Sequence, residues 1–375
     1  MKMNMTPRAK KLLAGLTAAA LTLSMLPATA LAAKDYATGG ETALRFSNSG
    51  ITVQEGDYDG YKIDGTELTI NAAGTYVLSG SCADGSVTVK KGTTGVVLVL
   101  DGLTLTCGDS AAIACNKSTE VTIVAADGTV NTLADTEQNN DETYPDNDSA
   151  ENAVIKCKDG SQVTLCGSGT LNVTANGKNG VKSGATTDEE GAASLTISAG
   201  DDALHCDLSL TVGASGTAGP DIDITGCYEG IEAANLAIRS GDIDITATDD
   251  CLNAANSDLT GYSFTMDISG STINAYTSGG DGFDSNGSLT ISGGVIAVWT
   301  ANTADNQPLD VSQTGSIGGF ADNSSVSGYA RTAMAWANGA GLISGMGDNT
   351  LAPRGTATRG QAAVILMGLD KLAGL

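Results

Sequence analysis

The sequence predicts an all-β fold, a right-handed parallel β-helix (solenoid), with a small α-helical unit at its C-terminal end. First, a polar–small–apolar–x–small phrase recurs, as NGVKS at Asn179, DALHC at Asp202, EGIEA at Glu229 and DGFDS at Asp281. Second, short segments with apolar residues at every second position, the period of a half-buried strand, separate the copies. Third, no helical period occurs between residues 40 and 315, whereas two helical patterns follow residue 320.

The first segment, residues 1–32, has the pattern of a secretory signal peptide. A basic stretch precedes an apolar run from Leu12 to Leu26, and small-residue cleavage triplets end at Ala30 and Ala32. Pro27 ends the apolar run short of the roughly 20 residues that a membrane span needs. We therefore expect an exported protein with no membrane span after signal removal.

Residues 33–315 carry the repeat and form the predicted β-helix. Successive copies of the phrase lie 21 to 31 residues apart, at Asn152, Asn179, Asp202, Glu229, Asp250 and Asp281. Rungs of this length without a crossover helix are typical of a parallel β-helix. An antiparallel sandwich is the alternative, but it would need more hairpin turns and more core aromatics. One apolar residue of each rung should stack inward, namely Val154, Val181, Leu204, Ile231, Leu252 and Phe283.

The segment at about 135–151 is too polar to be a rung. It reads DTEQNNDETYPDNDSAE, with turn-forming Asn, Asp and Pro residues throughout. We expect a loop insertion that projects from the stacked strands.

The charge of the chain is concentrated in its middle. The formal net charge is −24, and residues 33–315 hold 11 of the basic and 40 of the acidic residues, a balance of −29. Such a field repels nucleic acid and anionic membranes, and it favours multivalent cations or anions that arrive with a cation. Nucleic acid is therefore excluded as a partner.

The acidic residues of the phrase should form a row along the stack. Equivalent positions on neighbouring rungs lie one strand spacing apart, about 4.8 Å. Asp202, Glu229, Asp250 and Asp281 at this spacing would repel one another by roughly 3–4 kcal/mol per pair at an effective dielectric constant near 20. The alternative is that each aspartate merely forms a turn in water.

Calcium is the cation that this pattern favours. It takes 6–8 oxygen ligands, including carboxylates and backbone carbonyls, in irregular geometry. The flanking residues Asp201, Asp249 and Asp284, together with Asp207 and Asp258, would supply further ligands. The single histidine, His205, and the inward position of the cysteines disfavour zinc.

A second column follows the inward apolar residues and should face outward beside the acidic row. It contains Lys156, Lys182, His205, Glu232, Asn253 and Asp284. Beside bound calcium, Lys182 could act as the base that removes a proton alpha to a uronic acid carboxylate. An ordinary surface lysine, or one that binds a sugar carboxylate, is the alternative, and no arginine flanks Lys182 to steady the intermediate.

The eight cysteines do not have the pattern of a disulfide framework. Cys115, Cys157 and Cys206 occupy a slot of the repeat that other copies fill with Ser or Ala. A slot of this kind selects a small buried side chain, so we expect mostly free thiols. Cys115 and Cys157 could lie on neighbouring rungs, within the roughly 4.4–6.8 Å Cα separation that a disulfide requires.

The segment 60–300 resembles a family of secreted bacterial carbohydrate-binding proteins. The resemblance rests on TYVLSG, VVLVLDGLTLT, VTIVAADGTVNTL, LCGSGTLNVTANGKNGVKS and the DDAL, EGIE and DGFD phrases. It implies a calcium-binding right-handed β-helix with a pectate-lyase-like shape. It also implies binding of acidic plant polysaccharide, such as polygalacturonate, and of cellulose. This chain departs from the family pattern at Glu229, which replaces Asp, and at Asn179 and Asn152.

The C-terminal segment, residues 316–375, resembles a single S-layer homology repeat. Two helical patterns, YARTAMAWANGAG and TRGQAAVILMGL, flank the turn-rich GMGDNTLAP. Thr358 can cap the second helix, with Gln361 at the third position. The resemblance implies that Thr358 and Arg359 bind a secondary cell wall polymer, and Arg359 can pair with a carboxylate through two hydrogen bonds.

Together these features predict a protein at the cell surface or in the cell wall of a bacterium. It would bind acidic, uronic-acid-containing plant polysaccharide with Ca²⁺, tethered by the C-terminal repeat. A calcium-dependent polysaccharide lyase and a structural or adhesion protein remain as alternatives.

Overall fold

The structure is a computed structural model. It describes residues 41–56, 60–184, 186–189, 194–259, 262–301, 306–311, 317–339, 341–346 and 348–372. The predicted signal peptide at residues 1–32 lies outside these residues.

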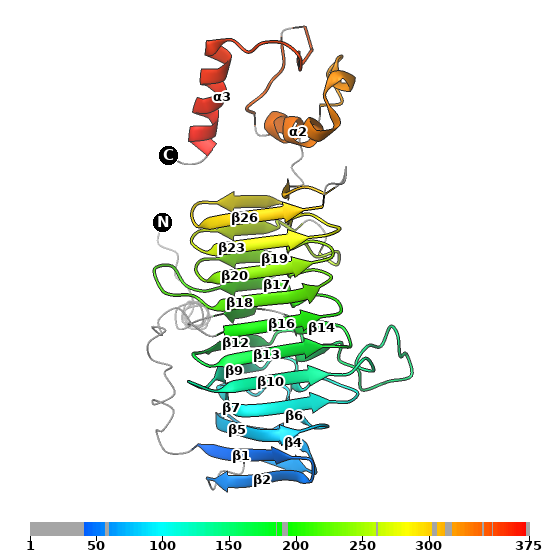
Figure 1. Cartoon of the computed structure of the whole chain (residues 1–375), viewed down its shortest axis with the longest axis vertical. Helices are drawn as coiled ribbons and strands as arrows, with labels where there is room; N and C mark the ends of the chain where they lie inside the picture. Colours follow the sequence, from blue (N-terminus) through cyan, green and yellow to red (C-terminus); the bar gives the residue numbers. More distant parts are fainter. Residues whose placement is uncertain are drawn as a thin grey trace, which may run out of the picture.

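Short β-strands make up most of the described chain (Figure 1). Those before the polar segment at 135–151 are β1 (Thr42–Ser47), β2 (Gly50–Glu55), β3 (Tyr61–Asp64), β4 (Glu67–Ile70), β5 (Gly74–Cys82), β6 (Ser86–Val89), β7 (Val96–Cys107), β8 (Ile113–Cys115), β9 (Glu120–Ala125) and β10 (Val130–Asp135). Those after it are β11 (Ala153–Cys157), β12 (Gln162–Gly167), β13 (Thr170–Ala175), β14 (Asn179–Ser183), β15 (Thr186–Glu189), β16 (Ser194–Ala199), β17 (Leu204–Val212), β18 (Asp221–Cys227), β19 (Ile231–Ile238), β20 (Asp242–Ala247), β21 (Leu252–Ala254), β22 (Thr265–Ile268), β23 (Thr272–Thr277), β24 (Phe283–Ser285), β25 (Ser288–Ile291), β26 (Val295–Thr300) and β27 (Leu309–Val311).

The predicted fold class, a right-handed parallel β-helix, is wrong. In the described part of the chain the strands form two long mixed sheets, without a closed barrel, and two short helices accompany them. The sheets are mixed because β1 pairs antiparallel with β2, and β3 with β4. The connection between β3 and β4 is a tight turn with Gly65 at a φ of 62°. The Asp-Gly pair at Asp64–Gly65 is a known hairpin signal, but it lies outside the repeated phrase and was not used to predict the fold.

The other pairings are parallel and join strands two or three places apart in the chain, except that β1 pairs with β5. We call each stretch from one strand to its parallel partner a rung. The apolar residue of one rung lies opposite that of the next, as in Val181 with Leu204, Leu204 with Ile231, and Leu252 with Phe283. These side chains are buried and belong to one continuous core.

The predicted inward column is out of register at its first member. Ile155, not Val154, lies opposite Val181, and Ala153, not Asn152, lies opposite Asn179. Asn152 has a φ of 59° and ends the loop that precedes β11. Asn adopts this left-handed backbone conformation more readily than most residues do. The extra residue at position 152 shifts the first copy of the phrase by one position relative to the next copy.

All eight cysteines are buried and none is in a disulfide, in agreement with the prediction of mostly unbridged thiols. Cys115 lies opposite Cys157 on the neighbouring strand, and Ser183 lies opposite Cys206. Burial and a hydrogen bond to Cys115 raise the pKa of Cys157 well above its usual value. The slot of the repeat that holds Cys115, Cys157, Ser183 and Cys206 therefore serves packing between neighbouring rungs.

The polar segment between β10 and β11 consists of turns and projects from the stacked strands (Figure 1). Buried Asn139 holds its base together. Its amide donates to Asp135 Oδ2 (2.8 Å) and to the Ala153 carbonyl (3.0 Å), and its Oδ1 accepts from the backbone of Glu151 (2.7 Å).

The C-terminal segment contains two short 3₁₀ turns, Asn323–Ser325 and Gly328–Ala330, and the helices α2 (Arg331–Gly339) and α3 (Arg359–Leu372). Its small core is separate from the strand core and centres on Ile317, Val326 and Leu351.

Candidate functional site

Four carboxylate residues lie in file along one edge of the stack, where their spacing predicts them. We call Asp202, Glu229, Asp250 and Asp281 the acidic row. The amide that follows each row position donates to the carbonyl of the next row residue, as from Ala203 to Glu229 (3.0 Å) and from Cys251 to Asp281 (3.2 Å). Neighbouring members are therefore separated by about one strand spacing, close to 4.8 Å.

Side chains of this file also support the backbone. Asp250 Oδ1 accepts from the amide of Asp281 (2.6 Å), and Asp281 Oδ1 accepts from the amide of Gln307. Asn179, one rung before the acidic row, accepts in the same way from the amide of Asp202 (3.3 Å) without carrying a charge. The uncharged amide of Asn179 makes the same kind of bond as the carboxylates of Asp250 and Asp281. These bonds to the backbone therefore need a side-chain oxygen but no charge, and turn formation alone does not explain why the row consists of carboxylates.

A second file lies three residues further along each rung, and we call it the mixed row. Strand pairing places its members one above another in the order Lys156, Lys182, His205, Glu232, Asn253, Asp284 and Asp310. The row changes from basic to acidic along the stack. Burial, and then the charge of Lys182, lower the pKa of Lys156.

His205 joins the two rows at the point where the charge changes sign. Its Nδ1 lies 2.7 Å from Asp202 Oδ2 and 2.9 Å from Glu232 Oε2, and its Nε2 lies 3.1 Å from Asp207 Oδ1. Hydrogen bonds to these three carboxylates outweigh burial and raise the pKa of His205 to about 11. An imidazolium therefore neutralises this end of the acidic row.

The next rungs along the stack have no such internal cation among their described neighbours. Burial, and then the charge of Glu232, raise the pKa of Glu229 to about 8. Burial is also the main cause that raises the pKa of Asp250 to about 7 and that of Asp284 to about 6, and neighbouring carboxylates add to it. These three groups resist ionisation together, as carboxylates that share a site do.

Asn253 brings a buried acceptor to the same group of carboxylates. It lies between Glu232 and Asp284 in the mixed row and is 7% exposed. Its Nδ2 donates to Glu229 Oε2 (3.0 Å), but its Oδ1 is buried without a hydrogen-bond partner among the described residues. A buried acceptor without a protein donor needs a partner of another kind, such as a water molecule or a cation.

The oxygen atoms of Glu229, Asp250, Asn253 and Asp284 are of the type that calcium prefers. Among the described residues, the side chains whose ligand atoms lie within 4.8 Å of one another are those of Asp202, His205 and Glu232, which His205 already joins as a donor. Gly280 leaves no room for a side chain beside the acidic row, because a Cβ there would lie 2.4 Å from Asp249 Oδ1 and 2.5 Å from Asp250 Oδ1.

The flanking residues named in the sequence differ in their partners. Asp201 pairs with Lys178 Nζ at 3.4 Å, and Lys178 also contacts Glu142 in the polar loop at 2.6 Å. Asp249 accepts from the hydroxyl of Tyr228, which raises the pKa of that phenol to about 12. Asp201 and Asp202 therefore have protein cations beside them, whereas Asp249, Asp250, Asp281 and Asp284 have none among the described residues.

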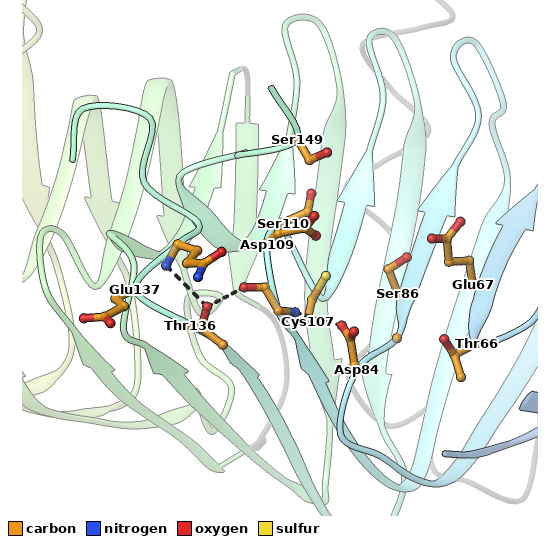
Figure 2. Close-up of a pocket in the computed structure, with 13 residues that line it drawn as sticks. Thr66, Glu67, Asp84, Ser86, Cys107, Asp109, Ser110, Thr136, Glu137 and Ser149 are labelled. Atoms are coloured by element: carbon orange, nitrogen blue, oxygen red, sulfur yellow. Dashed lines mark hydrogen bonds between the residues drawn. The ribbon is translucent and has the colours of Figure 1, made fainter. Parts of the chain in front are cut away.

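A polar cleft of about 760 Å³ lies further down the stack, beside the polar loop (Figure 2). The carboxylates of Glu67, Asp84, Asp109 and Glu137 line it, with serine and threonine hydroxyl groups between them. Sequence reasoning missed this cleft, because it is formed by turns of several rungs and by the inserted loop, which the repeat phrase does not mark.

A family of carbohydrate-binding domain-containing proteins matches residues 64–218 and again residues 190–340. The chain belongs to this family. An S-layer homology domain matches residues 319–363, which indicates association with a bacterial cell surface or cell wall. Among the described residues, no helix combines the length and the apolar character that a membrane crossing requires.

A carbohydrate-binding domain-containing protein of Acetivibrio thermocellus is 37% identical over 130 residues, which are 34% of this chain and 44% of that relative. The match thus spans less than half of the relative's length. A solved structure described as the polysaccharide lyase-like protein from C. thermocellum, in a gadolinium derivative, is 25% identical with a TM-score of 0.49, and the match covers 72% of this chain and 96% of that one.

In the S-layer homology domain, Thr358 and Gln361 form the predicted capping box. The backbone of Gln361 donates to Thr358 Oγ1 (3.2 Å), and the backbone of Thr358 donates to Gln361 Oε1 (2.8 Å). Arg359 is the first residue of α3. Polymer binding by Thr358 and Arg359 stays a prediction.

Proposed function

We propose that this protein binds acidic, uronic-acid-containing polysaccharide at the cell surface through calcium held on the two rows. The single observation that carries the proposal is the unpartnered, buried Oδ1 of Asn253 beside Glu229 and between Glu232 and Asp284. An uncompensated cluster of this kind costs stability unless a cation completes it.

Glu229, Asp250, Asn253 and Asp284 would hold the cation, with Asp249 and Asp281 as neighbouring carboxylates. This set is narrower than the one the sequence predicted. Asp202 is left out because His205 already neutralises it, and Asp201 because it pairs with Lys178. Bound calcium would supply a positive centre that a uronate carboxylate can approach.

The basic end of the mixed row would contribute the second contact. Lys156 and Lys182 lie opposite one another on neighbouring strands, and His205 follows Lys182. A uronate polymer along this edge would place one carboxylate near the lysines and another near the calcium. Its binding would then require both the metal and the lysines.

The binding function is preferred to the lyase alternative. A lysine that acts as a base has to be neutral, and burial lowers the pKa of Lys156, a lysine that the sequence did not predict as the base. Formation of unsaturated uronide from polygalacturonate, lost in Lys182→Ala, would establish a lyase instead.

Affinity electrophoresis in polygalacturonate gels, with calcium or with EDTA, tests the proposal. We expect retardation with calcium only, and we expect Asp250→Asn/Asp284→Asn to abolish it. Asp101→Asn is the matched control, because Asp101 is exposed on β7, away from both rows. Equal retardation in EDTA, or in the double variant, would refute the calcium-dependent mode.

A further inference from the structure

Two aromatic side chains stand side by side on the outer face of one sheet. Tyr276 of β23 lies directly opposite Trp299 of β26 in parallel register. The two residues are 48% and 55% exposed, although only 4% of the chain is aromatic and it has only two tryptophans. An exposed pair of large rings is costly on a soluble surface and is typical of a binding site.

The neighbouring positions on this face offer hydrogen bonds rather than a dry apolar surface. Asn274 and Thr272 point outward from β23 at alternating positions before Tyr276, and Asn274 donates to Asp244 Oδ1 of β20 (2.8 Å). The pyranose ring of a sugar has an apolar face and a rim of hydroxyl groups. Rings beside amide, hydroxyl and carboxylate groups match both parts of it.

A groove of about 570 Å³ runs along the other end of the same strands. It is lined by the turns around Pro220, Gly241, Ser271 and Gly294, and by Val295, the first residue of β26. Ser271 is 5% exposed, and its Oγ has no hydrogen-bond partner among the described residues. Trp299 is four positions after Val295, which is about 13 Å along a strand.

The charge of the face excludes acidic polymers. Asp221 and Asp223 of β18 and Asp242 and Asp244 of β20 lie on it, and none of β18, β20, β23 and β26 carries a lysine or arginine. A uronate polymer would be repelled here, whereas an uncharged one would not. The second match to the carbohydrate-binding family, residues 190–340, includes all four strands.

We propose that the outer face of β20, β23 and β26 is a second polysaccharide site, specific for uncharged pyranose polymers, in which Tyr276 and Trp299 stack on the sugar rings. The groove at Ser271 and Val295 would receive the hydroxyl rim of the same polymer. This site needs no metal and does not depend on the proposed calcium site.

Trp299 provides a direct spectroscopic test. In Trp336→Phe it is the only tryptophan, so its emission reports on this face alone. Uncharged hexasaccharides (hexaoses) of glucose, of xylose and of mannose are titrated into the protein with EDTA present. We expect a saturable change of Trp299 emission with at least one of them, and no change with the corresponding monosaccharides.

Calorimetry with the hexaose that binds then compares variants. Loss of an aromatic contact at the centre of a site costs at least about 1.4 kcal/mol, so Tyr276→Ala and Trp299→Ala should each weaken binding at least about tenfold. Trp299→Tyr should retain part of the affinity. Tyr262→Ala is the control, because Tyr262 is an exposed tyrosine elsewhere that contacts Phe264.

The outcomes separate this site from the calcium site. Retention of calcium-dependent retardation in polygalacturonate by Tyr276→Ala/Trp299→Ala, together with loss of hexaose binding, supports two independent sites. Absence of binding by all three hexaoses, binding that the two aromatic substitutions leave unchanged, or hexaose binding that Asp250→Asn/Asp284→Asn abolishes would overturn the proposal.

Discussion

At the scale of single residues, the charge of His205 decides how one end of the acidic row is held. Asp202 is buried and lies within hydrogen-bond distance of the same imidazole nitrogen as Glu232. At the other end Asn253 Oδ1 has no such partner among the described residues. The carboxylates near Asp202 are therefore neutralised by a histidine of the protein. Those near Asn253, a few rungs further along, have no such partner, and we propose that calcium neutralises them.

Removing the internal cation should be costly. We predict that His205→Gln lowers the free energy of unfolding by about 3–5 kcal/mol, since it leaves buried Asp202 and half-buried Glu232 without their partner. Chemical denaturation measures this. Asp202→Asn/His205→Gln/Glu232→Gln, which removes the charges together, should recover most of the loss. If His205→Gln alone were as stable as the wild type, the imidazolium would not be needed to stabilise the fold.

Removing the excess carboxylates should have the opposite effect on the metal-free protein. We predict that Asp250→Asn/Asp284→Asn raises the melting temperature in EDTA, because the amides relieve the repulsion between carboxylates. The new amide oxygen at position 250 can still accept from the backbone of Asp281, as Asn179 does from that of Asp202. The same variant should lose its response to calcium. A lower melting temperature in EDTA would contradict the electrostatic argument.

At the scale of secondary-structure elements, the turns that enter each rung position the ligands. Gly280 precedes Asp281, and a Cβ there would also lie 2.4 Å from the Asp249 carbonyl carbon, which is backbone and cannot move aside freely. We predict that Gly280→Ala destabilises the protein by about 1–3 kcal/mol and weakens calcium binding, as measured by chemical denaturation and calorimetry. Gly226→Ala is the matched control, because an added Cβ there meets no atom within 4 Å and, as at Gly280, φ is not positive.

The elements show what the sequence could predict and what it could not. The phrases at Asp202, Glu229, Asp250 and Asp281 predicted strand positions and the file of carboxylates, since period and register are local properties. The β1–β2 and β3–β4 hairpins precede the first copy of the phrase, so the repeat did not predict them. Asn152 shifted one copy of the phrase by one residue. The contacts of His205 and the Tyr276–Trp299 pair depend on which strands become neighbours. One copy of the phrase carries no information about the residues of the next rung, so these contacts could not be predicted from it.

At the scale of the whole molecule, the strand stack concentrates a negative field that pH and calcium should modulate together. Glu229, Asp250 and Asp284 have pKa values raised to about 8, 7 and 6, so their contribution to stability is present at low pH and is lost as pH rises through these values. His205, with its pKa raised to about 11, adds stability that is complete below its unfolded value of 6.5 and declines above it.

Both effects have the same sign. We predict that the melting temperature in EDTA falls between pH 5 and pH 8, and that calcium affinity rises over the same range, because the metal competes with protons at the carboxylates. Thermal melts across this range, with and without calcium, measure both. A metal-free protein that becomes more stable towards pH 8 would contradict the assignment of these groups.

In the proposed calcium site, Glu229, Asp250, Asn253 and Asp284 hold a divalent cation. Thermal melting of the full chain at pH 7.5 during a calcium titration tests it most directly. We predict a saturable rise in melting temperature, of the form expected for a ligand that binds only the folded state, with reversal by EDTA and no rise in Asp250→Asn/Asp284→Asn. A melting temperature that calcium leaves unchanged, or raises equally in that variant, would contradict the claim.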